Sequence, residues 1–101
     1  MTQSAILDAI WKTINDRVEN PTEDSYTCHI LSHRKGIDKA LEKVGEESTE
    51  FIIAVKNKES GSIIGEASDL LFHLMLALKA ADLEMEDVYT ELAKRHIPTQ
   101  E

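Results

Sequence analysis

The chain has 101 residues, a length that favours one domain, and we expect that domain to span residues 1–101. Its 19 acidic and 11 basic residues give a net charge of −8, which argues against non-specific binding to nucleic acid or to a membrane surface. The single cysteine, Cys28, excludes an internal disulfide bond, and a reducing, cytoplasmic location is the simplest expectation.

Apolar residues recur at helical spacing near the start of the chain and predict an amphipathic helix over residues 4–18. Asn20-Pro21 ends this helix, because a proline disfavours the helical conformation in the residue before it. Residues 21–35 are polar and mixed, and we expect a loop with one helical turn near residues 25–31. A loop of this length in a small domain is often functional.

A second helix is predicted over residues 36–56. Its apolar face consists of Ile37, Leu41, Val44, Phe51, Ile52 and Val55. At about 100° per residue, a neighbouring stripe of the same helix is charged. This stripe consists of Lys39, Lys43, Glu47 and Glu50. The two glutamates therefore border the core, whereas Glu46 points nearly away from the apolar face.

Residues 57–62 are predicted as a turn, and a third helix follows over residues 62–81. Apolar side chains cover most of its circumference and leave one polar stripe, formed by Ser62, Glu66, Asp69 and His73. A helix that is apolar nearly all round has to be buried on several sides. One short chain would struggle to bury it, so we expect a homodimer with this helix at its centre.

The last predicted helix covers residues 84–96, with Asp82 as its N-cap and with Met85, Val88, Tyr89 and Leu92 facing inward. The sequence therefore predicts an all-α fold, a four-helix chain that forms a dimeric helical bundle. The apolar run at residues 70–78 is far shorter than the roughly 18 residues of a membrane span, so no membrane partner is expected.

Two pairs of carboxylates stand at i, i+3 spacing on the second and third predicted helices. They are Glu47 with Glu50, and Glu66 with Asp69. This spacing puts both members of a pair on one helix face, so two antiparallel helices could aim all four at one point. Clustered carboxylates repel each other unless a cation lies between them. Mg²⁺ is the expected occupant, because it prefers oxygen ligands and leaves positions for water and phosphate.

The alternative to a metal site is that these carboxylates form only a solvated helix face, which is the more common role of acidic residues at this spacing. Glu66 and Asp69 favour the shared metal, because they lie on the only polar stripe of an apolar helix, where unpaired charge is costly. A di-iron bundle would instead need Glu-x-x-His on two helices. None of the four histidines has a glutamate three residues before it. We expect His73 to be a buried, hydrogen-bonded histidine rather than a ligand.

Basic residues accompany the acidic pair of the second helix. Lys43 and Glu47 are spaced i, i+4 and could form only a weak helix-surface ion pair. Alternatively, Lys39 and Lys43 extend the metal site into a phosphate channel, to which Arg34 would contribute from the loop. The sequence leaves these two interpretations open.

The pattern Glu-Glu-x-x-Glu at residues 46–50, followed by Glu-x-x-Asp at residues 66–69, resembles the all-α, Mg²⁺-dependent nucleotide pyrophosphatases of the MazG-like group. Flanking segments narrow the resemblance to the phosphoribosyl-ATP pyrophosphatase family over roughly residues 5–96. These segments are Ser25-Tyr26-Thr27, Gly36-Ile37-Asp38-Lys39, Glu42-Lys43-Val44-Gly45-Glu46-Glu47 and Asp69-Leu70-Leu71-Phe72-His73-Leu74.

The resemblance implies hydrolysis of 1-(5-phosphoribosyl)-ATP to 1-(5-phosphoribosyl)-AMP and pyrophosphate, the second step of histidine biosynthesis. It implies that Mg²⁺ is held by Glu47, Glu50, Glu66 and Asp69. Glu46 or Glu47 would take the proton of the attacking water. Lys39 and Lys43 would neutralise phosphate oxygens, and Ser25 and Thr27 would donate hydrogen bonds to the substrate.

Two other functions remain as alternatives. One is a different MazG-like enzyme that removes non-standard or excess nucleoside triphosphates with the same metal site. The segments at residues 25–27 and 36–39 favour the histidine pathway over this activity. The other is a non-catalytic helical dimerisation module, in which the carboxylates are only a solvated face.

Overall fold

The computed structural model describes residues 3–100. A short 3₁₀ turn, Gln3–Ala5, precedes five α-helices and, within the described residues, there is no strand. The helices are α1 (Ile6–Glu19), α2 (Tyr26–Leu31), α3 (Ile37–Lys56), α4 (Ser60–Ala80) and α5 (Met85–Arg95). The predicted all-α fold is confirmed, but the helix count of four is wrong. The turn expected near residues 25–31 is a short helix in its own right, which Ser25 caps by accepting a hydrogen bond from the Cys28 backbone N–H at 3.2 Å.

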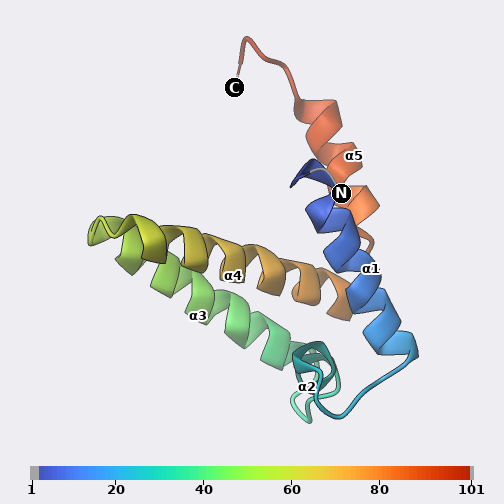
Figure 1. The fold of residues 1–101 in the computed structure, drawn as a ribbon. Helices are drawn as coiled ribbons and strands as arrows, with labels where there is room; N and C mark the ends of the chain where they lie inside the picture. The colour runs from blue at the N-terminus through green and yellow to red at the C-terminus, as the bar shows by residue number, and fades with distance from the viewer. Residues whose placement is uncertain (1–2, 101) are drawn as a thin grey trace.

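Helices α3 and α4 form a long antiparallel hairpin that dominates the molecule (Figure 1). Gly36 begins α3 with a φ of 62°, in the left-handed region that favours glycine. At the other end of α3, Lys58 has a φ of 57° and turns the chain into α4. Helix α4 begins at Ser60, two residues before the predicted start, and includes Gly61 despite the cost of about 1 kcal/mol that glycine carries inside a helix.

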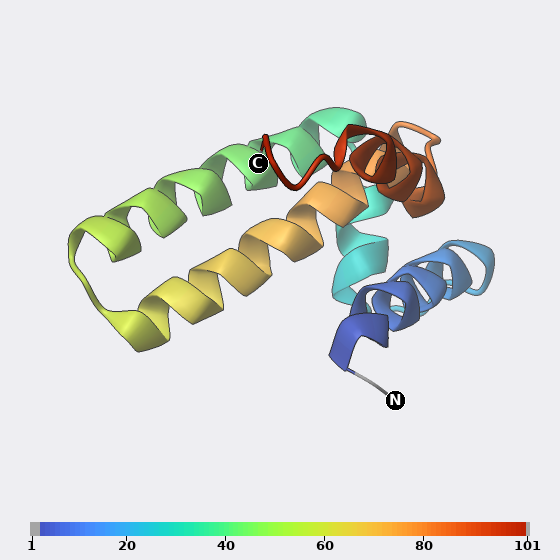
Figure 2. The same ribbon diagram turned by 90° about the horizontal axis from the view of Figure 1, so that it is seen from above.

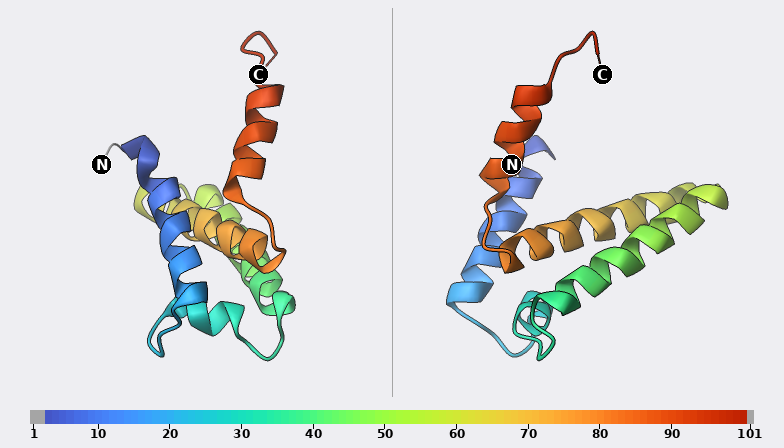
Figure 3. Two further views of the ribbon diagram at one scale, coloured as in Figure 1. Left: turned by 90° about the vertical axis from the view of Figure 1, so that its right-hand side faces the viewer. Right: turned by 180° about the vertical axis from the view of Figure 1, so that it is seen from behind.

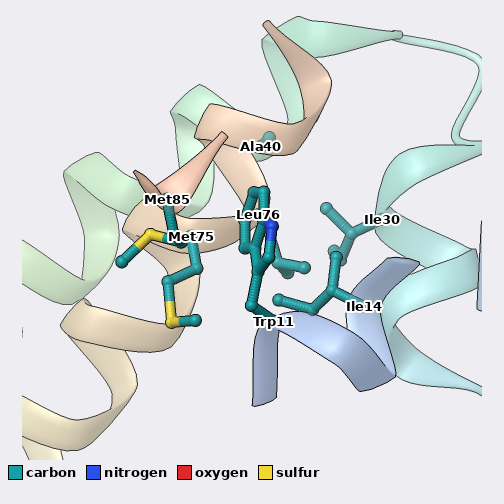
Figure 4. Close-up of a cluster of buried hydrophobic side chains, with 7 residues drawn as sticks. All are labelled: Trp11, Ile14, Ile30, Ala40, Met75, Leu76 and Met85. Atoms are coloured by element: carbon teal, nitrogen blue, oxygen red, sulfur yellow. The ribbon is translucent and has the colours of Figure 1, made fainter. Parts of the chain in front are cut away.

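The hydrophobic core lies at one end of this hairpin, where the other helices gather (Figure 4). It is built from Trp11 and Ile14 of α1, Ile30 of α2, Ala40 of α3, Met75 and Leu76 of α4, and Met85 of α5. The opposite end of the hairpin extends away from α1, α2 and α5 (Figures 2 and 3). Near that end Ile52, Ile53 and Ile64 are 60 %, 53 % and 68 % exposed, so the chain does not cover this part of its own hairpin.

A hydrogen bond between distant parts of the sequence fixes the start of α5. The Trp11 indole Nε1 donates to Glu84 Oε2 at 2.9 Å, and Glu84 is also the N-cap of α5 in a capping box with Asp87. The predicted N-cap, Asp82, is therefore wrong: it has a φ of 60° and lies in the turn before the helix. Leu92 was expected to face inward but is exposed.

Helix α4 is long and apolar enough, by length and composition alone, to cross a membrane, with 21 residues and a mean hydropathy of 1.3 in its most apolar window. A helix at the centre of a helical assembly has the same properties. Two observations favour the assembly. The helix carries Glu66 and Asp69 on one side, and it packs along its length against α3. On another side Leu71 and Leu74 remain exposed, so the chain alone leaves α4 partly uncovered.

Candidate active site

The two predicted carboxylate pairs come together between α3 and α4. Oxygen atoms of Glu47, Glu66 and Asp69 all lie within 4.8 Å of one another. Glu50 belongs to the same group, because its hydrogen bonding and negative charge act on both Glu47 and Glu66. The i, i+3 spacing on each antiparallel helix produces this arrangement, since it aims two side chains from each helix at the space between them.

Parts of this cluster are buried in a way that is unfavourable for carboxylates alone. Glu47 is only 7 % exposed, and one oxygen each of Glu47 and Glu66 (Oε2) is buried without a hydrogen-bond partner in the described part of the chain. Burial raises the pKa of Glu47 and of Glu66 above the ordinary 4.5, and the neighbouring Glu50 raises both further. An unpaired buried polar atom destabilises a fold, so these atoms are suited to binding a cation.

A magnesium ion fits this donor set. The cluster offers only carboxylate oxygens, which hard divalent cations prefer over nitrogen or sulfur. The buried Oε2 atoms of Glu47 and Glu66, which have no hydrogen-bond partner within residues 3–100, supply lone pairs that such an ion would use. Glu50 and Asp69 are exposed, so one side of the cluster is open to solvent and to a ligand.

Lys43 brings positive charge to the edge of the cluster. Its Nζ lies 2.8 Å from Glu46 Oε2 and 3.7 Å from Glu47 Oε1, and the hydrogen bond to Glu46 raises the pKa of Lys43. Lys39 is directed instead toward Glu42, with 3.9 Å between Nζ and Oε1. Glu46 is exposed, as its position on the helix predicts. Lys43 is thus the lysine that the structure brings closest to the acidic cluster.

The remaining predicted substrate-binding residues have other surroundings. Ser25 uses its hydroxyl oxygen to cap α2, and Thr27 is buried, with 7 % of its surface exposed. Arg34 lies in the exposed turn between α2 and α3. Their roles toward a substrate stay predictions.

Tyr26 lies close to the acidic cluster, although no role was predicted for it. Its hydroxyl lies 2.7 Å from Nε2 of His73, whose Nδ1 lies 2.7 Å from the backbone oxygen of Asp69. His73 is 5 % exposed and packs edge-on between the rings of Tyr26 and Phe72. The expected buried, hydrogen-bonded histidine is therefore confirmed. Two features of the sequence could have pointed to this pair. Tyr26 is the centre of the Ser25-Tyr26-Thr27 segment, and His73 lies one helical turn after Asp69.

A hollow of about 510 Å³ adjoins Tyr26 on the side of α1. Its wall is mainly apolar and includes Ile6, Ile10, Thr13, Arg17, Tyr26 and Phe72. The ring of Tyr26 thus lines the hollow, while charges of the acidic cluster act on its hydroxyl. Burial raises the pKa of that hydroxyl, Lys43 lowers it by a smaller amount, and the carboxylates of Glu47 and Asp69 raise it slightly further.

Comparison with known proteins gives one consistent family. The family described as phosphoribosyl-ATP pyrophosphohydrolase matches residues 7–96. A phosphoribosyl-ATP pyrophosphatase of Methanosphaerula palustris is 58 % identical over 95 residues, covering 94 % of this chain and 96 % of that protein. Proteins with the same name from Methanoculleus marisnigri and Methanocorpusculum labreanum are each 52 % identical. These alignments cover 89 % and 94 % of this chain, and 93 % and 92 % of the relatives.

Proposed function

The chain belongs to the phosphoribosyl-ATP pyrophosphohydrolase family, and we propose on that premise that it hydrolyses 1-(5-phosphoribosyl)-ATP to 1-(5-phosphoribosyl)-AMP and pyrophosphate in histidine biosynthesis. The observation that carries the proposal is a pair of buried oxygens, on Glu47 and Glu66, that have no hydrogen-bond partner among the described residues and lie in the acidic cluster with Asp69 and Glu50. Enzymes that cleave phosphoanhydrides commonly use a divalent cation to bridge phosphate oxygens, and this cluster fits such an ion.

In this proposal Mg²⁺ is held by Glu47, Glu50, Glu66 and Asp69. When bound, the ion stabilises the charge that develops on the leaving pyrophosphate and lowers the pKa of the attacking water. The carboxylates supply the negative charge that draws the cation into a partly buried site. Their separation on two packed helices keeps the site from collapsing, because each pair is fixed to a rigid element.

The chain's other charged groups act on the substrate and on its proton. Lys43, which already lies at the edge of the cluster, turns from Glu46 to a phosphate oxygen, and Lys39 adds positive charge one turn away. Glu46 and Glu47 are the two candidates for the carboxylate that takes the proton of the attacking water. Glu46 has the advantage that it is exposed and is not one of the proposed metal ligands.

We also propose that the enzyme acts as a homodimer in the cytoplasm, without nucleic-acid or membrane partners. Exposed apolar residues on α4 and around the hairpin tip support the dimer, since a partner copy would cover them. The net charge of −8 supports the absence of nucleic-acid binding.

The test is pyrophosphate release from phosphoribosyl-ATP, measured beside a panel of ordinary nucleoside triphosphates with Mg²⁺ present. A strong preference for phosphoribosyl-ATP is expected. Equal or faster release from an ordinary triphosphate would move the assignment to another activity of the same metal site. No release from any of them would favour the non-catalytic interpretation.

A further inference from the structure

We propose that Tyr26 is a substrate-binding residue whose hydroxyl oxygen accepts a hydrogen bond from a hydroxyl group on the ribose that carries the phosphate chain. The inference rests on the proposed function, because it concerns the same site and the same nucleotide substrate. It names a contact to the ribose of that substrate, a group to which no residue was assigned from the sequence.

The first step of the argument is the position of the tyrosine hydrogen. The backbone oxygen of Asp69 can only accept, so the hydrogen bond at 2.7 Å places a hydrogen on Nδ1 of His73. In a neutral imidazole, Nε2 is then left as the acceptor. The Tyr26 hydroxyl, 2.7 Å from Nε2, therefore donates its only hydrogen to His73.

The second step concerns what the oxygen can still do. With its hydrogen committed to His73, the Tyr26 oxygen retains lone pairs and acts only as an acceptor. Phosphate oxygens are acceptors as well, so Tyr26 cannot bind the phosphate chain. A ribose hydroxyl is a donor and matches it.

The third step is the place of Tyr26 in the site. Its hydroxyl is linked through His73 to the backbone oxygen of Asp69, a residue of the cluster, and its ring lines the hollow of about 510 Å³ beside α1. The acidic cluster, the Tyr26 hydroxyl and the mainly apolar hollow thus follow one another in space. A nucleotide presents phosphate, sugar and base in the same order, so a substrate with its phosphates at the cluster carries its ribose past Tyr26.

The experiment compares phosphoribosyl-ATP with two analogues that lack the 2′ or the 3′ hydroxyl on the ribose bearing the triphosphate. Values of kcat and KM are measured for the wild type, for Tyr26→Phe and for the control Tyr89→Phe, whose hydroxyl lies on α5 beside Asp8. Calorimetry on the same proteins gives the affinities for the products phosphoribosyl-AMP and pyrophosphate. Phenylalanine keeps the ring that packs against Phe72, and circular dichroism checks the fold.

For the wild type, we expect one of the two analogues to show a KM roughly three- to tenfold higher, the effect of one neutral hydrogen bond. Tyr26→Phe should have a similarly raised KM for phosphoribosyl-ATP, with no further increase for that analogue. It should bind phosphoribosyl-AMP correspondingly more weakly and pyrophosphate normally, and Tyr89→Phe should behave as wild type.

Three results would overturn the inference. The first is a wild type that treats both analogues like the full substrate. The second is a Tyr26→Phe variant that loses as much from the missing hydroxyl as the wild type does. The third is a variant that loses pyrophosphate affinity instead, because the hydroxyl would then donate to phosphate. All three require a wild type that releases pyrophosphate from phosphoribosyl-ATP; absence of that reaction refutes the proposed function itself.

Discussion

Glu47 and Glu66 meet across the α3–α4 hairpin, and each ends in a carboxylate oxygen that is buried without a hydrogen-bond partner in the described residues. Burial and the nearby Glu50 raise the pKa of both groups, so the pair is unfavourable as long as both carboxylates are charged and alone. The same arrangement becomes favourable when a divalent cation binds between them. Stability and activity should therefore respond in opposite directions when one of these charges is removed.

Removing one ligand charge should abolish most activity and leave the fold intact. For Glu47→Gln and Glu66→Gln we expect a loss of about 100-fold or more in pyrophosphate release. Residues that only support metal ligands already account for 10- to 100-fold effects when they are changed. Glu91→Gln is the matched control, since Glu91 is an exposed residue that pairs with Arg95 at 2.7 Å. If Glu66→Gln were as active as Glu91→Gln under saturating Mg²⁺, the four-carboxylate site would be wrong.

Magnesium should stabilise the folded chain, because a ligand that binds only the folded state shifts the unfolding equilibrium. At a concentration 100 times its dissociation constant, the ion would add about 2.7 kcal/mol to the free energy of unfolding. For a domain of this size that corresponds to a rise in Tm of roughly 10 °C or more. Scanning calorimetry in Mg²⁺ and in EDTA measures it. An unchanged Tm at several millimolar Mg²⁺ would count against a metal site.

The pH dependence of stability without metal should carry the signature of the raised carboxylate pKa values. A carboxyl group with a folded pKa above its ordinary 4.5 binds its proton more tightly in the folded chain. Its stabilising effect is complete below about pH 4.5 and is lost as the pH rises through the folded pKa. In EDTA, the Tm of Glu47→Gln should therefore gain on that of the wild type between pH 4 and pH 7. If the Tm of Glu47→Gln instead fell relative to that of the wild type over this interval, the assigned direction of the pKa shift would be wrong.

Glu42 shows why this comparison needs the variant rather than the wild type alone. Its hydrogen bond and ion pair with Lys35 lower its pKa, so its contribution is present above pH 4.5 and is lost in acid. The two effects have opposite signs in one chain. Subtracting the variant from the wild type cancels the part that comes from Glu42.

The chain should be a dimer at micromolar concentration. Leu71 and Leu74 on α4 are 50 % and 42 % exposed, and the isoleucines near the hairpin tip are more exposed still. Several large exposed apolar side chains on one hairpin favour an interface there. Sedimentation equilibrium should give twice the mass of 11.4 kDa. Leu71→Glu should dissociate the dimer, whereas Leu92→Glu, at a leucine of α5 that is 60 % exposed, should not. A fully folded wild-type monomer would refute the argument.

Loss of the Glu84 side chain should destabilise the end of the molecule that holds the core. Glu84 both caps α5 and accepts the Trp11 indole hydrogen bond, so Glu84→Ala should lower the free energy of unfolding by about 1–2 kcal/mol. Glu86→Ala, two residues further along and exposed, is the control. Urea denaturation of both variants distinguishes them. Equal midpoints would mean that the cap and the indole bond contribute little.

Local patterns in the sequence were sufficient for the four longer helices and for the carboxylates, because both depend on spacing within one element. Glu47 with Glu50, and Glu66 with Asp69, needed only the helical period and an antiparallel turn to meet. The N-cap of α5 was not predictable in the same way. Asp82 and Glu84 are both acids before a helix; Glu84 forms the capping box with Asp87 and also accepts the hydrogen bond of Trp11, which is 73 residues away.

The hydrogen bond between Tyr26 and His73 could also not be predicted from the sequence. It joins the short helix α2 to the long helix α4 across 47 residues, and no periodicity relates two such positions. The substrate roles of Ser25 and Thr27 came from the resemblance alone, whereas that of Arg34 came from its place in a loop beside a possible phosphate channel. The structure gives Ser25 a capping contact and buries Thr27, so any role in binding has to be compatible with those contacts.

Trp11 is an intrinsic fluorescence probe that reports on only one region of the protein. It is the only tryptophan of the chain, it is 8 % exposed, and it lies in the core with its indole bonded to Glu84. Its fluorescence therefore registers whether α1 and α5 are docked on the base of the hairpin. A ligand that binds at the carboxylate cluster binds outside this region. Its binding would leave the tryptophan emission unchanged unless α4 transmits a conformational change from the cluster to the core.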